Sequence, residues 1–145
     1  MKLKFEENNI KGDGNCLFRS LGVAMKLNHK ELRNIACIYM LKNQNKKIKG
    51  TSIKQWIKYE SDQDIRSYVK NMKLDGTWGG AIEITMLTKI FDINVFVLKN
   101  KENGKGYKII STFITDNKNR NIFLNYDGTH YNYLNVIKNL TDFKM

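Results

Sequence analysis

The sequence predicts an α+β domain in which the helices come first and a largely antiparallel sheet comes last. Apolar residues recur at helical spacing between Cys16 and Phe91, whereas short β-branched runs separated by glycine-bearing turns follow from Ile93 onward. The length of 145 residues corresponds to one domain, and we assign residues 1–145 to it. This order is typical of a central, mostly antiparallel sheet of about four to five strands flanked by about five helices.

The helices can be placed from their caps and apolar stripes. Two glycines indicate a loop directly before Cys16, where a helix begins. Asn28 followed by Glu31, and Ser52 followed by Gln55, are capping patterns that open two further helices. We therefore predict an irregular segment over 1–15, helices over 16–27, 28–42, 62–72 and 81–91, and one helix that opens at Ser52.

Four strands are predicted after the last helix. Ile93–Leu98 is apolar and rich in β-branched residues, which favours a buried strand. The polar segment 101–106 contains two glycines and is typical of a hairpin connection. The remaining strands are expected over 107–115, 122–126 and 130–137.

The composition excludes several classes of protein. Apolar residues make up 41% of the chain, which is too many for a disordered segment. The longest apolar run, Ile35–Leu41, is far shorter than the ~18 residues that a membrane span needs. The N-terminal segment turns acidic at Glu6 and Glu7 before any apolar stretch forms, so it does not resemble a signal peptide. We therefore expect no association with a membrane. We also expect the protein to be a monomer.

The few cysteines and histidines argue against a metal centre and against a disulfide scaffold. None of them forms a pair at zinc-ligand spacing, so we expect no metal and no cofactor; the four residues are Cys16, His29, Cys37 and His130. Two cysteines fit a reducing compartment. We therefore expect a cytoplasmic protein, in the cytoplasm of the host if the chain comes from a virus or an intracellular pathogen.

The net charge of +11 leaves a nucleic-acid partner as an alternative. Only four of the 25 cationic side chains are arginines, although arginine is the better bidentate reader of phosphate. Lysine, asparagine and isoleucine share A/T-rich codons, so a biased genome explains the same excess. We interpret the charge as a solvated basic surface that includes Lys42, Lys46, Lys47 and Lys49, and we expect no nucleic-acid partner.

The most informative segment is Asp13-Gly14-Asn15-Cys16, which joins a glycine loop to a helix. The N-terminus of a helix carries partial positive charge and unpaired N–H groups, which stabilise a thiolate and can face a developing oxyanion. One short segment can therefore supply a nucleophile and an oxyanion hole. The alternative is that Cys16 is a buried structural thiol.

A second candidate segment is His130-Tyr131-Asn132. Residues two apart in a strand point to the same face, so His130 and Asn132 can lie side by side. An asparagine beside a histidine can hold one ring nitrogen and leave the other for a thiol. The alternative is a histidine that only satisfies hydrogen bonds in its strand.

Together these segments resemble the OTU (ovarian tumour) family of cysteine proteases. Asp13 through Ser20 is similar to the family's nucleophile motif, and His130-Tyr131-Asn132 is similar to its histidine motif. Between them, Trp78-Gly79-Gly80 with Glu83 and Leu87, and then Ile93-Asn94-Val95, resemble the family's central loop–helix–strand block. The resemblance spans about residues 11–136 and implies the papain-like OTU fold.

The resemblance also implies a function, the hydrolysis of isopeptide bonds after the C-terminal Gly-Gly of ubiquitin. Cys16 would be the nucleophile, His130 the general base, and Asn132 the residue that orients His130, where the family has Asp or Asn. The backbone amides of Asp13, Gly14, Asn15 and Cys16 would form the oxyanion hole, and Trp78 and Gly79 would line the channel for the modifier's tail. The implied partners are ubiquitin or ubiquitin chains, and ubiquitin-like modifiers as in some viral and bacterial members.

Several alternatives remain open at this point. Within proteases, the substrate could be a viral polyprotein or another host protein, and a non-catalytic ubiquitin-binding module is a further class. Trp78 could pack into the core while its glycines make a turn. Cys37 lies inside the apolar run of its helix, which predicts a structural thiol. Gly22 is expected to cost its helix some stability.

Overall fold

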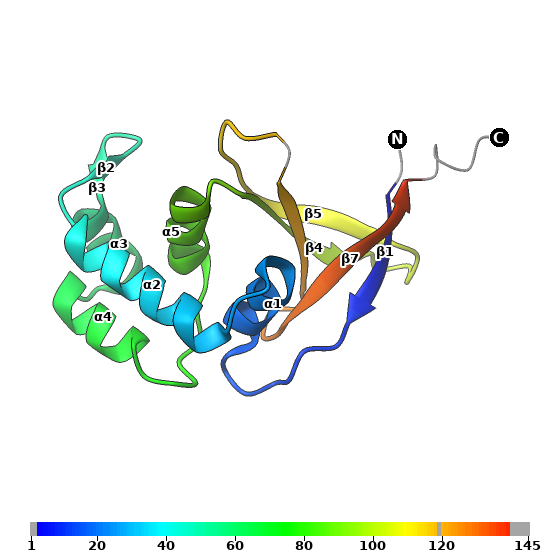
Figure 1. Cartoon of the computed structure of the whole chain (residues 1–145), viewed down its shortest axis with the longest axis horizontal. Helices are drawn as coiled ribbons and strands as arrows, with labels where there is room; N and C mark the ends of the chain where they lie inside the picture. The colour runs from blue at the N-terminus through cyan, green and yellow to red at the C-terminus, as the bar shows by residue number, and fades with distance from the viewer. Residues whose placement is uncertain (1–2, 119, 140–145) are drawn as a thin grey trace.

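The structure is a computed structural model that describes residues 3–118 and 120–139. Within these ranges it contains five helices, which confirms the α-helical part of the prediction (Figure 1). They are α1 (Cys16–Met25), α2 (His29–Lys42), α3 (Ile53–Ser61), α4 (Ile65–Met72) and α5 (Ala81–Phe91). No helix in the described ranges is long and apolar enough to cross a membrane.

The described strands form a mixed sheet of five and a small hairpin. The large sheet has the order β1-β7-β6-β4-β5, with β1 (Leu3–Asn8), β4 (Asn94–Asn100), β5 (Tyr107–Phe113), β6 (Asn121–Tyr126) and β7 (Tyr131–Asn139). Only β4 and β6 pair in parallel, so the prediction of a mostly antiparallel sheet is confirmed. The hairpin consists of β2 (Lys47–Ile48) and β3 (Thr51–Ser52).

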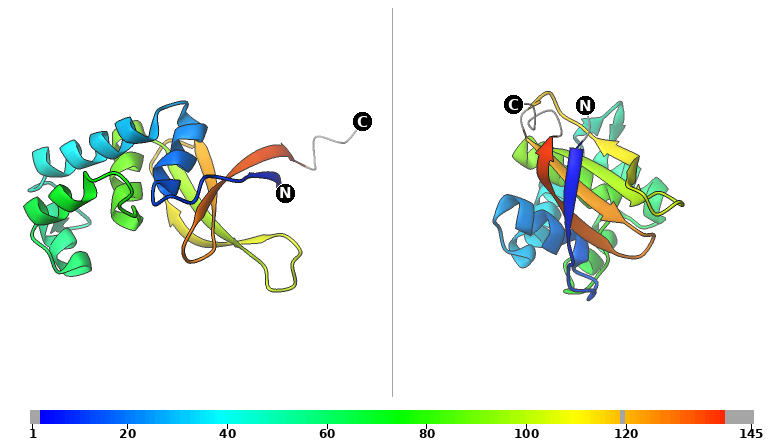
Figure 2. Two further views of the ribbon diagram at one scale, coloured as in Figure 1. Left: turned by 90° about the horizontal axis from the view of Figure 1, so that it is seen from below. Right: turned by 90° about the vertical axis from the view of Figure 1, so that its right-hand side faces the viewer.

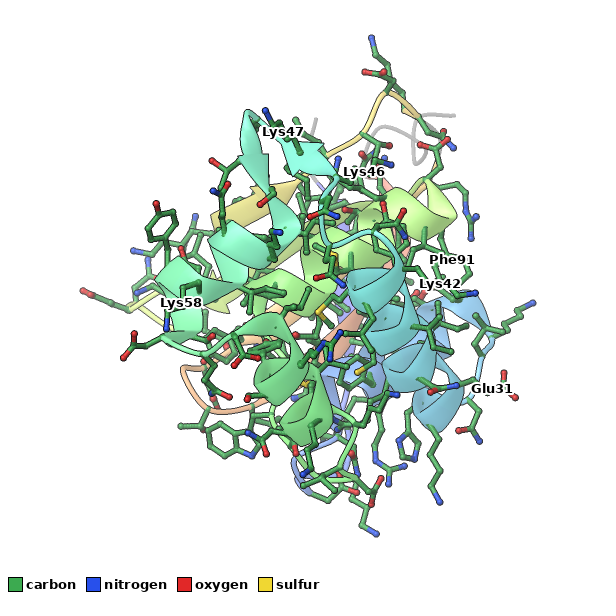
Figure 3. The ribbon with its side chains drawn as sticks, turned by 90° about the vertical axis from the view of Figure 1, so that its left-hand side faces the viewer. Glu31, Lys42, Lys46, Lys47, Lys58 and Phe91 are labelled. Carbon is green, nitrogen blue, oxygen red and sulfur yellow. The ribbon has the colours of Figure 1, made fainter. Side chains whose placement is uncertain are left out.

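The helices and the sheet lie at opposite ends of the molecule, with α1 between them (Figures 1 and 2). One face of the sheet packs on α1 and α5 through apolar side chains such as Val95 and Leu124, both fully buried. The helices α2, α3 and α4 form the other end, where the predicted lysine cluster is exposed around the end of α2 and the β2–β3 hairpin (Figure 3).

The sequence analysis missed two strand regions, the β2–β3 hairpin and β1. The prediction that residues 1–15 are irregular is wrong, because β1 forms an antiparallel ladder with β7 at the edge of the sheet. The alternation of apolar and polar side chains in this edge strand is short, and its exposed side chains Lys4 and Glu6 are both charged. Its stability comes from a partner more than a hundred residues away in the sequence, which local patterns do not reveal.

The predicted cost of Gly22 also needs correction. A Cβ on Gly22 would lie 2.5 Å from the carbonyl oxygen of Leu27, where the chain folds back after α1. The Leu27 N–H donates to the Gly22 carbonyl at 3.0 Å and closes this turn. Glycine is therefore required for the close approach of the backbone.

Candidate active site

Cys16 is the first residue of α1 and follows the loop that leads out of β1. The first N–H groups of a helix have no partner inside the helix and favour a thiolate. The Cys16 side chain is 8% exposed, and its Sγ accepts a hydrogen bond from the Tyr131 N–H at 3.5 Å. Because Tyr131 follows His130, this contact places Cys16 beside the start of β7.

His130 and Asn132 meet as the sequence predicts. Nε2 of His130 lies 2.7 Å from Oδ1 of Asn132. Nδ1 of His130 lies near the loop that leads to Cys16, since a Cβ added to Gly12 would be 3.7 Å from it. The fold therefore brings the three predicted catalytic residues to one place, with the Asn132 oxygen at one ring nitrogen of the histidine.

An ion pair shapes the loop before the nucleophile. The Arg19 guanidinium donates to both oxygens of Asp13, the shortest contact being 2.6 Å, and holds the pKa of this carboxyl well below its ordinary value. Asp13 Oδ1 also accepts the Asn15 N–H at 3.1 Å. The predicted oxyanion hole is therefore corrected at Asn15, whose N–H is engaged, while the amides of Asp13, Gly14 and Cys16 remain its predicted donors.

A buried polar network beneath this loop was missed by the sequence analysis. Asn15 Oδ1 accepts hydrogen bonds from Arg33 Nη2 at 2.6 Å and from the Gly76 N–H at 2.9 Å. Arg33 also donates to the carbonyl of Met72 at 2.9 Å, and its guanidinium lies 4.5 Å from the centre of the Phe18 ring. The signal in the sequence was an arginine among the apolar residues of its helix, because charged groups are buried only with partners.

A second loop, residues 73–80, packs against the nucleophile loop. Gly14 has φ +81°, and a Cβ there would lie 2.1 Å from the Gly76 carbonyl oxygen. A Cβ on Gly79 would lie 2.9 Å from the Phe18 ring. Trp78, which lies between Gly76 and Gly79 in the sequence, is 63% exposed, so the alternative that it packs into the core is wrong. Its assignment with Gly79 to a substrate-tail channel stays a prediction.

Glu83 and Cys37 are buried away from solvent. Glu83 is 1% exposed and accepts hydrogen bonds from the Tyr68 hydroxyl at 2.5 Å and the Gly80 N–H at 2.8 Å, which fixes the start of α5. Burial raises the pKa of the Glu83 carboxyl and raises the pKa of the Cys37 thiol to about 11.

Within residues 3–118 and 120–139, no group of three or more His, Cys, Asp and Glu side chains could hold a metal ion.

Comparison with known families decides how this site is classified. The model of the OTU-like cysteine proteases matches residues 11–134, which include all three predicted catalytic residues. The chain belongs to this family. It is 32% identical over 127 residues to the ovarian tumor domain-containing deubiquitinating enzyme 7 of Arabidopsis thaliana, a match that covers 85% of this chain and 31% of that protein.

A further relative and a solved structure are also similar to the chain. The OTU domain-containing protein 2 of Saccharomyces cerevisiae is 26% identical over 145 residues, which covers 90% of this chain and 45% of that protein. The Hazara virus OTU bound to ubiquitin has the same fold, with a TM-score of 0.73, 18% identity and coverage of 93% of this chain and 83% of that one. The chain spans less than half the length of these curated relatives.

Proposed function

We propose that this OTU domain is a thiol-dependent deubiquitinase that cleaves the bond after the C-terminal glycine of ubiquitin. The observation that carries the proposal is the placement of Cys16 at a helix N-terminus beside His130 and Asn132. Two comparisons support it: one relative is named a deubiquitinating enzyme, and a structural neighbour is described as bound to ubiquitin.

The reaction follows from this geometry in two steps. His130 takes the thiol proton, and Cys16 Sγ attacks the carbonyl of the terminal glycine to form a tetrahedral oxyanion. Collapse of this intermediate expels the lysine amine, which receives the proton from His130, and leaves a thioester on Cys16. Water then gives a proton to His130 and attacks the thioester carbonyl, and collapse of this second intermediate breaks the bond to sulfur. The modifier leaves with a free carboxyl group, and the proton on His130 returns to the sulfur of Cys16.

The substrate range belongs to the same proposal. Ubiquitin and its chains are the first candidates, and ubiquitin-like modifiers with the same Gly-Gly tail fit the same chemistry. We place the reaction in the cytoplasm, where a reducing environment keeps the Cys16 thiol available.

The decisive experiment is incubation of the purified chain with fluorogenic C-terminal amides of ubiquitin and of a panel of ubiquitin-like modifiers. We expect release from ubiquitin and loss of release in Cys16→Ala. The matched control is Cys37→Ala, which replaces the other cysteine and should remain active. Activity of Cys16→Ala equal to that of the parent would refute the mechanism, and no release from any modifier would refute the function.

A further inference from the structure

Glu7 of β1 lies on the same face of the sheet as Asn132. Glu7 pairs with Leu134 of β7, and Asn132 precedes Leu134 by two residues in the same strand. Side chains two apart in a strand share a face, which makes Glu7 and Asn132 diagonal neighbours. The contact follows from this register: Glu7 Oε2 accepts a hydrogen bond from Asn132 Nδ2 at 2.8 Å.

Two other strands complete the surroundings of the Glu7 carboxylate. Asn125 of β6 donates to Oε2 at 2.9 Å, and the Tyr107 hydroxyl of β5 donates to Oε1 at 2.9 Å. Partial burial works to raise the pKa of Glu7, but these hydrogen bonds, with that of Asn132 and the charge of His130, outweigh it and lower the pKa. The group at this position is therefore a carboxylate, which only accepts hydrogen bonds.

This contact, together with the N–H of Ile10, sets which way the Asn132 amide faces. With Nδ2 on the Glu7 carboxylate, Oδ1 is turned to the opposite side, where it lies 2.7 Å from His130 Nε2 and accepts the Ile10 N–H at 2.8 Å. A carbonyl oxygen cannot donate, so Nε2 of His130 carries the proton in this contact. The lone pair of the neutral imidazole is then on Nδ1.

We propose that Glu7 is a positioning residue for the reaction: by holding the amide of Asn132, it fixes the Nε2–H tautomer of His130 and leaves Nδ1 to take the thiol proton. The kinetic part of this inference rests on the proposed function, whereas the tautomer is a property of the free protein. The same contact favours asparagine over aspartate at position 132 in this chain, because a second carboxylate would lie against that of Glu7.

The tautomer can be measured by the ¹⁵N chemical shifts of His130. We would use Cys16→Ser as the parent protein, because a thiolate beside the imidazole would stabilise its doubly protonated form. The spectra would be recorded at about pH 9, where an imidazole is neutral. His29 is the only other histidine, and His29→Gln identifies its signals. We expect Nε2–H in the parent, a mixture of tautomers in Glu7→Gln, and no change in the matched control Glu6→Gln, whose exposed side chain lies on the other sheet face.

The kinetic test is a double-mutant cycle on hydrolysis of the ubiquitin amide. We expect Glu7→Gln to lower kcat about tenfold with little change in KM, since the Ile10 N–H still holds the Asn132 oxygen. Asn132→Asp should cost more, because two carboxylates then face each other. Combining the two should raise kcat/KM about tenfold or more above Asn132→Asp alone, because the new carboxylate accepts from the new amide.

The outcomes separate this inference from the proposed function. A parent with the Nδ1–H tautomer, Glu7→Gln with the spectrum of Glu6→Gln, or a double variant as slow as the product of the single effects would overturn the role of Glu7. No ubiquitin hydrolysis by the wild-type chain would overturn the proposed function, and the spectra would still decide on Glu7.

A second variant protects the test from a folding defect. Tyr107→Phe removes one donor to Glu7 and keeps the edge-to-face contact of its ring with Phe5, whose centres lie 5.6 Å apart. Circular dichroism and thermal melting would establish that each variant is folded. If Glu7→Gln does not fold, Tyr107→Phe should shift the tautomers and lower kcat in the same direction, by about twofold to threefold; unchanged spectra and rates would overturn the proposal.

Discussion

Asn15 and Arg33 are joined by a 2.6 Å hydrogen bond although both side chains are almost completely buried. Asn15 directly precedes the nucleophile, and Arg33 lies in α2. The contact therefore fixes the loop before Cys16 to the helical part of the molecule. Because Arg33 also donates to the carbonyl of Met72 at the end of α4, one guanidinium ties three segments together.

Replacing Arg33 tests how much this hydrogen-bond network contributes to the stability of the fold. Arg33→Met retains an unbranched apolar side chain but leaves the buried Met72 carbonyl and one lone pair of Asn15 Oδ1 unpaired. We expect a loss of roughly 1–3 kcal/mol in the free energy of unfolding, measured by urea denaturation. The control is Arg66→Met, an exposed arginine on α4 that should stay within about 0.5 kcal/mol of the parent. Equal stabilities of the two variants would contradict a structural role for Arg33.

Gly14 offers a second test, of the contact between the two loops. In Gly14→Ala, the new Cβ would combine a φ of +81° with an approach of 2.1 Å to the Gly76 carbonyl oxygen, so one of the loops must move. Gly50→Ala is a matched control, with φ +85° and no atom within 4 Å of its Cβ. Both should pay the cost of a left-handed backbone, about 1 kcal/mol.

The difference between the two glycine variants isolates the clash. We expect Gly14→Ala to melt at a lower temperature than Gly50→Ala and to lose most of its hydrolytic activity, because the displaced loop carries predicted oxyanion donors. Gly50→Ala should keep its activity. A Gly14→Ala protein as active as Gly50→Ala would show that the loop can move without affecting catalysis.

The sequence revealed the parts of this site that are local. A helix N-terminus and a strand periodicity of two can be recognised within a few residues. These local patterns were enough to predict the roles of the segment Asp13 to Cys16 and of the pair His130 and Asn132. Glu7 could not be found this way. Its contact with Asn132 spans 125 positions and depends on the register between β1 and β7, which was itself missed.

The same limit applies to features whose local signal points in the wrong direction. Gly22 looked unfavourable by helix propensity, yet the turn that brings Leu27 back leaves no space for a Cβ. Arg33 stood out in the sequence only as an arginine among the apolar residues of its helix, and its partners come from a loop and the end of another helix. The turn at Leu27 outweighs the helix propensity at Gly22, and tertiary contacts outweigh the cost of burying Arg33.

The two cysteines should differ sharply in reactivity. Cys37 is fully buried, and burial raises the pKa of its thiol to about 11, so it stays protonated and inaccessible at neutral pH. Cys16 is the first residue of α1 and is 8% exposed, so its sulfur can be reached. Treatment of the folded chain with iodoacetamide should therefore add one group, at Cys16, as read by mass spectrometry of the peptides. Faster labelling of Cys37 than of Cys16 would contradict the assigned roles.

Trp78 provides the last test, of the predicted channel for the substrate tail. Its indole is 63% exposed, so Trp78→Ala should change the free energy of unfolding by less than about 0.5 kcal/mol. The neighbouring Gly79 backs onto the Phe18 ring near the nucleophile, which places this loop beside the site. An indole wall beside a glycine can exclude a substrate Cβ, and we therefore expect strong selection for glycine at the scissile carbonyl.

The selection can be measured with two ubiquitin substrates that end in Gly or in Ala. We expect kcat/KM to fall a hundredfold or more for the Ala tail, which corresponds to about 2.7 kcal/mol of transition-state discrimination. In Trp78→Ala the ratio should shrink, because the wall that meets the added methyl group is gone. Rates within about twofold for the wild-type chain, only ~0.4 kcal/mol, would refute a narrow channel. An unchanged Gly-to-Ala ratio in Trp78→Ala would instead assign the wall to another residue.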